Sequence, residues 1–346
     1  MWPPLGIQAI RRPKLEMHLP GFEMSKETTL DNTDRVTVPS FVWNDGAGLE
    51  LAGVCDVGCV RKENQDYMGY FERAGDVLLV VSDGMGGHQG GYEASRTAVN
   101  ACGEVFSAAK SKVSAYKLLS DAVKLANKRI IAAAKDNPLL RGMGATVVMV
   151  LVRGDEYWLG HVGDSRAYRI SGGQATQITR DHSRVQMLID AGLLAPERAK
   201  GHPMGHVLEF ALGIDKEVEI DVSEKPYKLH EGECLILCSD GLWGLVEDSE
   251  IAGAISGGEI ATEAQSLVDL ALKRGGNDNT TVAILRYTGD APTDEYEREQ
   301  ETDEVERDLG FEHSVTVRIK KSSYLGDLAL LVLVVVVGVV GLIAAL

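Results

Sequence analysis

The sequence has few cysteines and a deficit of positive charge. Five cysteines among 346 residues are a small and odd number, which argues against a disulfide framework and favours a reducing compartment. The 35 basic residues are outnumbered by 51 acidic ones, so the net charge is −16 and we expect no nucleic-acid partner. The N-terminus also lacks the apolar core of a secretory signal. Hydrophobic residues make up 45% of the chain, which is enough to bury a core and excludes wholesale disorder.

One long apolar run is present, at residues 328–346, where no side chain is charged or polar. As a helix this run would rise roughly 28 Å, close to the ~30 Å hydrocarbon core of a bilayer. A buried helix of a soluble core is the alternative, but such a helix normally carries a polar stripe. Arg318, Lys320 and Lys321 precede the run, and a basic flank favours the cytoplasmic side. The sequence therefore predicts a single-pass C-terminal anchor over residues 322–346 in the cell membrane, with the rest of the chain in the cytoplasm.

Composition divides the rest of the chain into three parts. Residues 1–48 are interrupted by prolines and show no period, which predicts a flexible N-terminal extension. Residues 49–288 alternate β-rich and helical segments and form the expected globular domain. Residues 289–321 combine an acidic linker with a basic juxtamembrane segment. A stretch so rich in acidic residues cannot bury a core, so we expect the linker to be solvated.

Hydrophobic runs and helical stripes alternate within the expected domain. The predicted strands are Val77–Ser82, Thr146–Val152, Tyr157–Val162, Arg166–Ile170, Cys234–Ser239 and Thr280–Arg286. The predicted helices are Ala94–Phe106, Tyr116–Ala134 and Ala261–Arg274, and the second has an apolar stripe from Leu119 to Ile130. Residues 153–155 would form the turn of a hairpin. Strands joined by hairpins, with helices in separate blocks, indicate an α+β fold with antiparallel sheets.

Five aspartates stand out by their position. Asp83, Asp164, Asp240 and Asp278 each adjoin a β-rich run and a glycine or small residue, and Asp66 lies in the segment VRKENQDY. Rigid strand ends can bring carboxylates to one sheet edge, where cations keep them ionised. Mg²⁺ and Mn²⁺ take such oxygen ligands, and a neighbouring glycine lets a backbone carbonyl join them. Each pair by itself is compatible with an ordinary turn, but the five together favour a metal site.

Seven short motifs then follow one another in order. They are R-x-x-N-Q-D (Arg61–Asp66), D-G-M-G-G-H (Asp83–His88), G-M-G-x-T (Gly142–Thr146), G-D-S-R (Gly163–Arg166), D-H-S (Asp181–Ser183), S-D-G-L (Ser239–Leu242) and G-G-x-D-N-x-T (Gly275–Thr281). Each motif alone is weak, but the ordered set is highly specific. Together they resemble the type 2C, metal-dependent Ser/Thr protein phosphatases, and most of all the bacterial branch, over about residues 50–288.

The resemblance implies an α-β-β-α four-layer sandwich of two antiparallel sheets, with a metal centre at one end. By motif position, Asp83 would bridge two Mn²⁺ or Mg²⁺ ions and position the nucleophilic water, with the Gly84 carbonyl on one of them. Asp240 and Asp278 would complete the first ion's shell. Asp66 would support the second ion, directly or through water.

The resemblance also implies the remaining parts of the site. A third, weaker ion would use Asp164 together with Asp240, and Arg61 would capture phosphate through its planar donors. Water between two divalent ions has a lowered pKa, so hydroxide would attack phosphorus directly. No nucleophilic cysteine or serine is then expected, and Cys234 and Cys238 lie in a predicted buried strand.

Several positions depart from the family pattern. Met85 stands where relatives outside the bacterial branch have a histidine that is a candidate general acid, so the proton donor is unassigned. Gly244 replaces an acidic ligand of the third ion found in some relatives. Residues 178–213 correspond to a mobile flap beside the active site and depart from the pattern at His206, Glu209 and Phe210. The candidate substrate-flap residues are His182, His202, His206 and Phe210.

The sequence thus predicts a membrane-tethered phosphatase that hydrolyses phosphoserine and phosphothreonine in proteins. Its expected partners are phosphorylated proteins, among them a membrane Ser/Thr kinase that it opposes. A catalytically inactive phosphoprotein-binding module at the membrane is the alternative, and an adaptor whose acidic linker binds basic partners is a third reading. The complete set of aspartates, together with Arg61, argues against the inactive module.

Overall fold

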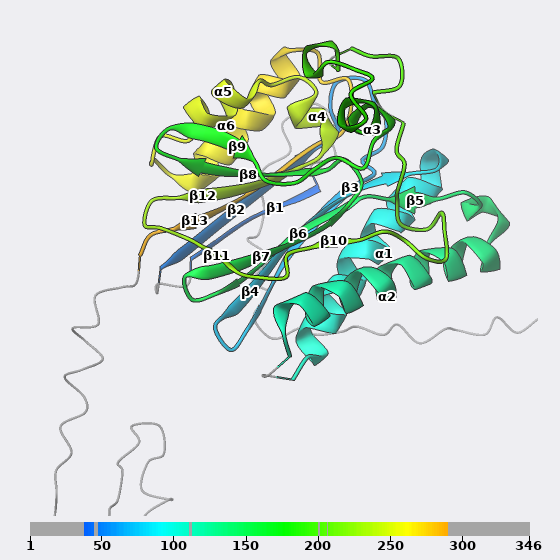
Figure 1. The fold of residues 1–346 in the computed structure, drawn as a ribbon, viewed down its shortest axis with the longest axis horizontal. Helices are drawn as coiled ribbons and strands as arrows, with labels where there is room; N and C mark the ends of the chain where they lie inside the picture. The colour runs from blue at the N-terminus through cyan, green and yellow to red at the C-terminus, as the bar shows by residue number, and fades with distance from the viewer. Residues whose placement is uncertain (1–37, 45–47, 111–112, 200, 206, 290–346) are drawn as a thin grey trace, which may run out of the picture. The chain divides into compact units, whose positions relative to one another are not determined.

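The computed structural model describes residues 38–44, 48–110, 113–199, 201–205 and 207–289. Within them, two antiparallel sheets pack face to face, and helices cover both outer faces (Figure 1). The prediction of an α+β fold with two antiparallel sheets in an α-β-β-α order is confirmed.

The first sheet has six strands in the spatial order β1-β2-β13-β12-β8-β9. They are β1 (Val38–Asn44), β2 (Leu49–Asp56), β13 (Thr280–Tyr287), β12 (Cys234–Cys238), β8 (Arg166–Ser171) and β9 (Gln174–Gln177). Every neighbouring pair is antiparallel. All eight residues of β13 are buried, because the other sheet covers one of its faces and helices cover the other.

The second sheet has seven strands in the main order β10-β7-β6-β4-β3, with β11 beside β7 and β5 beside β4. They are β3 (Asp66–Arg73), β4 (Asp76–Met85), β5 (Gly144–Ala145), β6 (Val147–Arg153), β7 (Glu156–Val162), β10 (Asp221–Val222) and β11 (Tyr227–Lys228). The predicted hairpin between β6 and β7 is confirmed. Arg153 pairs with Glu156, so the turn consists of two residues, and Gly154 takes a positive φ of 59° there.

Helices lie on the outer face of each sheet. The second sheet is covered by α1 (Gly87–Ala108) and α2 (Ala115–Asp136), and the first by α4 (Asp240–Trp243), α5 (Asp248–Ala254) and α6 (Ile260–Lys273). The connections contain α3 (Arg184–Asp190) and two 3₁₀ helices, Pro138–Leu140 and Pro196–Arg198. All three predicted helices are present, although α1 begins at Gly87 rather than Ala94. The apolar stripe predicted for α2 is buried.

Alternation along the central strands divides the core into layers. On β4, Leu78 packs under α1 and α2, whereas Leu79 faces the other sheet. On β12, Leu235 faces the other sheet, whereas Ile236 packs under α4 to α6. Because successive side chains point to opposite faces of a strand, each continuous apolar run supplies two core layers at once.

The folded region begins earlier than predicted. Residues 38–44 were expected within the flexible extension, but they form β1, an edge strand paired with β2. Phe41 and Trp43 turn inward onto the ring of Tyr70, with ring centroids 4.8 and 5.9 Å away, whereas Val42 between them is 63% exposed. This alternation covers only a few residues and adjoins a proline, which an edge strand tolerates, so the sequence pattern is too short to reveal it.

Three predicted segments fall outside the described residues. They are residues 1–37, the acidic linker from residue 290 onward and the anchor at 322–346. No helix in the described part of the chain is long and apolar enough to cross a membrane. The anchor therefore stays a prediction.

Candidate metal centre

The topology brings strand ends from both sheets together. Asp66 opens β3 and lies opposite Asp83 near the end of β4. Asp240 follows β12, and Asp278 precedes β13, its antiparallel neighbour. The end of one antiparallel strand meets the start of the next, so each sheet supplies two carboxylates. Asp164 adds a fifth, in the turn that carries the chain from β7 in the second sheet to β8 in the first.

A pocket of about 740 Å³ lies at these strand ends, and we call it the catalytic pocket. The predicted site residues that line it are Arg61, Asp83, Gly84, Asp164, Asp240 and Asp278. Asp66 lies behind them and is 3% exposed. The structure therefore gathers every residue that the sequence assigned to metal or phosphate binding.

One oxygen of Asp66 is held and the other is not. Asp66 Oδ2 accepts hydrogen bonds from Ser239 Oγ at 2.6 Å and from Thr281 Oγ1 at 2.7 Å. Its Oδ1 is buried and has no hydrogen-bond partner among the described residues. Burial raises the pKa of Asp66 to about 7 against these hydrogen bonds, and the charges of Asp240 and Asp278 add to the rise. A buried carboxylate oxygen without a partner fits a cation or its bound water.

Three neighbouring carboxylates, those of Asp83, Asp164 and Asp278, also have raised pKa values. Burial raises the pKa of Asp83 well above its usual value, and the charges of Asp66 and Asp240 raise it further. Burial also raises the pKa of Asp164 to about 8, followed in importance by the charge of Asp240. The pKa of Asp278 is raised for the same two reasons. A cation among these groups would offset their repulsion, and an all-oxygen donor set fits Mg²⁺ or Mn²⁺.

At two of these positions the residue after the aspartate must be glycine, because neighbouring backbone atoms approach it closely. A Cβ at Gly84 would lie 1.9 Å from Gly91 O and 2.7 Å from Gln65 O. A Cβ at Gly241 would lie 2.0 Å from Asn279 O. The two Asp-Gly pairs thus press the strand ends against α1 and against the segment before β13, which sets the positions of Asp83 and Asp240.

Arg61 reaches the site from the loop between β2 and β3. Its Nη2 donates to Asp278 Oδ2 at 2.5 Å, and half of its side chain is exposed. Asn279 fixes this loop, because its Oδ1 accepts from Gln65 N at 2.8 Å and its Nδ2 donates to Glu63 O at 3.0 Å. Asn279 belongs to the last of the seven motifs, but the sequence assigned it no role. Its amide can donate and accept at once, which is how it ties two loops together.

Thr146 connects the end of β4 to the turn that carries Asp164. Its Oγ1 accepts from Asp83 N at 2.9 Å and lies 2.6 Å from Ser165 Oγ. Its backbone N–H donates to Asp83 O at 2.8 Å. The sequence placed Thr146 inside a strand, whereas the structure places it between β5 and β6. It therefore joins the segments that carry Asp83 and Asp164 rather than extending the sheet.

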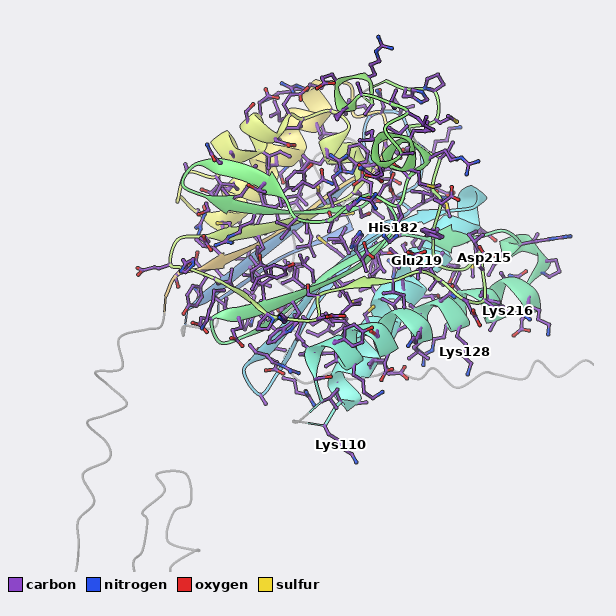
Figure 2. The ribbon with its side chains drawn as sticks, viewed as in Figure 1. Lys110, Lys128, His182, Asp215, Lys216 and Glu219 are labelled. Atoms are coloured by element: carbon purple, nitrogen blue, oxygen red, sulfur yellow. The ribbon has the colours of Figure 1, made fainter. Side chains whose placement is uncertain are left out.

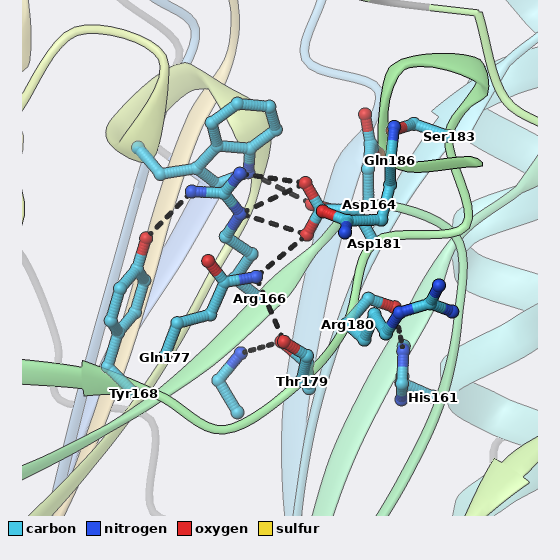
Figure 3. A network of polar contacts seen from close by, with 12 residues as sticks. His161, Asp164, Arg166, Tyr168, Gln177, Thr179, Arg180, Asp181, Ser183 and Gln186 are labelled. Carbon is cyan, nitrogen blue, oxygen red and sulfur yellow. Dashed lines mark hydrogen bonds and ion pairs between the residues drawn. The ribbon is translucent and has the colours of Figure 1, made fainter. Parts of the chain in front are cut away.

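A network of stacked and hydrogen-bonded side chains also supports Asp164 (Figure 3). Trp243 Nε1 donates to Asp164 O at 2.9 Å, and the guanidinium of Arg166 stacks on the indole at 3.8 Å from the ring centroid. Asp181 accepts from Arg166 at 2.7 to 3.2 Å and from Gln177 Nε2 at 3.0 Å. Arg166 and Asp181 belong to two of the motifs, which the structure thus joins into one support for Asp164.

His182 belongs to the segment 178–213 that was assigned to the flap, and it does not line the catalytic pocket. It is 8% exposed, and the edge of Phe210 meets its ring at 5.6 Å between centroids. Its backbone N–H donates to Gly163 O at 2.9 Å, and its Nδ1 accepts from Gly163 N at 3.3 Å. His182 therefore clamps the turn before Asp164, and its assignment to the substrate flap stays a prediction.

His161, His182 and Asp221 gather their ligand atoms within 4.8 Å of one another, a spacing compatible with a metal site. Their hydrogen bonds argue for another arrangement. His182 Nδ1 accepts from Gly163 N, so the ring proton is on Nε2, which lies 3.2 Å from Asp221 Oδ2. His161 Nε2 must donate to Arg180 O at 2.8 Å, because a carbonyl only accepts. Burial lowers the pKa of His161, which agrees with a neutral ring. The group is a hydrogen-bonded support for the flap.

Two other candidate flap residues, His202 and Phe210, do not line the catalytic pocket. His202 closes a local turn, with its Nδ1 accepting from Met204 N at 3.2 Å, and Phe210 packs on His182. Leu208 is the residue of the described flap that lines the pocket. His206 lies outside the described residues. The motif pattern names these residues, but their local packing sets the direction of the side chains of His202 and Phe210.

The described cysteines offer no activated thiol in the catalytic pocket. Cys55, Cys102, Cys234 and Cys238 are buried. Burial raises the pKa of Cys55 to about 12, and its Sγ lies 2.9 Å from Thr281 Oγ1. A thiol in such surroundings stays protonated.

The sequence profile of protein phosphatase 2C matches residues 60–254. The chain belongs to the protein phosphatase 2C family. It is 38% identical over 236 residues to the serine/threonine protein phosphatase PstP of Mycobacterium tuberculosis, a match that covers 68% of this chain and 44% of PstP. It is 33% identical over 241 residues to the protein phosphatase PhpP of Streptococcus pneumoniae, covering 68% of this chain and 97% of PhpP.

Solved structures agree with this assignment. The crystal structure of M. tuberculosis PstP matches with a TM-score of 0.63 at 36% identity, covering 70% of this chain and 100% of its own. The PstP catalytic domain in complex with two manganese ions matches with a TM-score of 0.61 at 35% identity, covering 70% and 99%. The bacterial protein phosphatase 2C resemblance is thus confirmed, whereas the chain spans less than half of the PstP sequence.

Proposed function

We propose that this chain is a metal-dependent phosphatase that hydrolyses phosphoserine and phosphothreonine in proteins. The observation that carries the proposal is that four aspartates line one pocket that Arg61 also lines, with Asp66 buried behind them. The names of PstP and PhpP as protein phosphatases support it, as does the PstP structure with two manganese ions. The chain carries an oxygen donor set suited to the same kind of ion.

Two Mn²⁺ or Mg²⁺ ions are the proposed cofactors, with a candidate third. The residues that would hold them are Asp66, Asp83, Gly84 through its carbonyl, Asp240 and Asp278, with Asp164 for the third. Divalent ions in such a site supply charge stabilisation for phosphate oxygens and a water that ionises near neutral pH.

The chain's own residues supply the orientation. Arg61 presents a planar set of donors at the opening of the pocket, suited to two phosphate oxygens at once. Asn279 keeps the loop of Arg61 in register with Asp278. Ser239 and Thr281 hold one oxygen of Asp66 so that the carboxylate cannot rotate freely. Because these contacts exist before a substrate binds, little reorganisation is needed during the reaction.

The proposal includes a location and a partner. Residues 322–346 anchor the enzyme in the cell membrane with its catalytic domain in the cytoplasm, for which the charge-free apolar run and its basic flank are the support. Tethering raises the effective concentration of substrates in the same membrane. A membrane Ser/Thr kinase is therefore the expected substrate and opponent.

The test of the activity uses the full chain purified in detergent. Phosphate release from a phosphothreonine peptide is followed with Mn²⁺, with Mg²⁺ and with EDTA. Activity should require the metal and should fall at least about 100-fold in Asp240→Asn, because a lost ligand affects metal binding more than a lost supporting contact does. Asp269→Asn on α6 is the matched control, since Asn keeps the contact with Gln265. A metal-loaded, folded chain without activity would instead support the phosphoprotein-binding module.

The test of the location compares the full chain with one that lacks residues 322–346. Turnover of a soluble phosphopeptide should be equal, whereas a phosphorylated kinase in vesicles should be dephosphorylated more slowly by the shortened chain. An equal loss on both substrates would contradict the tethering proposal.

A further inference from the structure

A second pocket opens beside the catalytic one, and we call it the basic pocket. It measures about 510 Å³ and lies between the C-terminal part of α2, the 3₁₀ helix that follows it and the segment after the flap. Ile131 and Ile214 form part of its apolar surface, and its charged residues are Lys135, Arg141 and Lys216. Figure 2 shows Lys216 beside α2.

All charges that line the basic pocket are positive, although the chain as a whole carries −16. No acidic side chain is among the described residues that line it. Within the described residues, Lys135, Arg141 and Lys216 form no ion pair. Three exposed cations around an apolar surface attract an anionic group carried by a peptide.

The wall that carries Lys216 is held by one buried side chain of α2. Asn127 is 3% exposed, and its Oδ1 accepts from Gly213 N at 2.7 Å. Its Nδ2 donates to Asp215 O at 2.8 Å and to Lys216 O at 3.3 Å. The backbone around the basic pocket is therefore fixed, while its charged side chains stay free to reach a ligand.

A short chain segment separates the two pockets. Arg141 lines the basic pocket, and Gly144 lies three residues further on. A Cβ at Gly144 would lie 2.7 Å from Met85 Cε, in the catalytic pocket, and 3.2 Å from Ile214 Cδ1, in the basic pocket. Three residues span at most about 11 Å. A peptide whose phosphate occupies the catalytic pocket can therefore reach the basic pocket with a residue a few positions away.

We infer that the basic pocket selects substrates with a second anionic group, an acidic side chain or a second phosphate, near the residue that is dephosphorylated. An extended peptide advances about 3.3 Å per residue, so the second group lies a few residues from the phosphorylated one. The inference rests on the proposed phosphatase function and defines its substrate class. Two observations support the inference: the lining charges of the basic pocket are all positive, and the two pockets share a wall at Gly144.

The experiment measures kcat/KM of the full chain, with Mn²⁺, on two matched sets of phosphothreonine peptides. In one set a single glutamate is moved along the peptide, and in the other a glutamine takes the same positions. The Glu-to-Gln ratio should rise in one window of positions. Each of Lys135→Gln, Arg141→Gln and Lys216→Gln should lower that ratio roughly 2- to 5-fold, and the triple variant should bring it to about one. A third set with a second phosphothreonine in the window distinguishes acidic side chains from phosphate.

Lys273→Gln, an exposed lysine on α6 far along the chain, is the matched control and should leave the ratio unchanged. Turnover of p-nitrophenyl phosphate reports separately on the catalytic pocket. A ratio near one at every position, or an unaltered ratio in the triple variant, overturns the inference. An equal acceleration of all substrates by the variants also overturns the inference, because it would mean that an acidic segment of this chain occupies the basic pocket. If no substrate is hydrolysed, the proposed function fails, and anisotropy of labelled Glu and Gln peptides still measures the preference.

Discussion

The catalytic pocket and the basic pocket share a wall but are built in opposite ways. The carboxylates of the catalytic pocket project from strand ends and lie mostly buried. Ser239 holds one oxygen of Asp66, whereas Thr146 and Trp243 hold the backbone of Asp83 and Asp164. The cations of the basic pocket are exposed, on long side chains without ion pairs among the described residues. Asn127 fixes the backbone that carries Lys216.

This difference shows what buried charges and exposed charges can each contribute to function. Buried like charges cost folding free energy, and their positions are rigid enough to bind ions and direct a reaction. Exposed charges cost little and are screened by salt, so they adjust to varied peptides and contribute modest selectivity. Substitutions in the catalytic pocket should therefore change both stability and activity strongly, whereas those in the basic pocket should change substrate preference alone.

The largest effect is expected from Gly84→Ala. The new Cβ would lie 1.9 Å from Gly91 O, a backbone atom that cannot move without shifting α1. The free energy of unfolding should fall by about 3 kcal/mol. Denaturant unfolding measures it, with Gly253→Ala in α5 as the control, because a Cβ there meets open space. Equal stability of the two variants would show that the strand end at Asp83 is not rigid.

Asp83→Asn should separate stability from function. Mn²⁺ affinity, measured by calorimetry, should fall at least about 100-fold. Burial and neighbouring charges raise the pKa of Asp83, so a neutral side chain there should make the metal-free protein more stable. Asp76→Asn, at the other end of β4 and paired with Arg153 at 2.9 Å, should leave Mn²⁺ affinity intact. Unchanged Mn²⁺ binding in Asp83→Asn would remove Asp83 from the metal site.

The pH dependence of stability should report the crowded carboxylates. The pKa values of Asp66 and Asp164, about 7 and about 8 in the folded chain, lie above the unfolded value of 3.8. The folded state then holds more protons than the unfolded state between these values. In EDTA, stability should fall as pH rises from 4 to 8, by up to about 1.4 kcal/mol per pH unit for each proton. Saturating Mn²⁺ should weaken or reverse this decline. A free energy of unfolding that does not change with pH in EDTA would contradict the raised pKa values of Asp66 and Asp164.

The smallest effect is expected from Trp243→Phe. Phenylalanine keeps an aromatic surface for Arg166 but loses the N–H that donates to Asp164 O. A loss of about 1 kcal/mol in the binding of the weakest metal ion is expected, about fivefold in affinity. Trp158→Phe on β7 is the control, because Trp158 contacts Arg153 and not the metal site. Equal Mn²⁺ titrations for both variants would show that the stacked network does not position Asp164.

Much of the fold was predictable because its signals are local. The run VLLVVS is apolar on both strand faces, as a strand between two layers must be, and it forms the centre of β4. The stripe of α2 recurs every three or four residues, and it packs on the second sheet. β1 escaped prediction because its inward residues, Phe41 and Trp43, are held by Tyr70, a contact that no short pattern contains.

The sequence by itself determined the family, the carboxylates and the Asp-Gly pairs, because these are read from residue types and spacing along the chain. The tertiary structure decided which residues support the site, namely Thr146, Asn279 and Trp243. It also decided that His182 contacts Gly163 and does not line the catalytic pocket. It also placed the basic pocket beside the catalytic one, from residues on α2, the following 3₁₀ helix and the segment after the flap. The physical reason is distance along the chain. A local pattern records which face of an element is buried, whereas a hydrogen bond or a pocket wall between segments far apart arises only when the sheets and helices have packed.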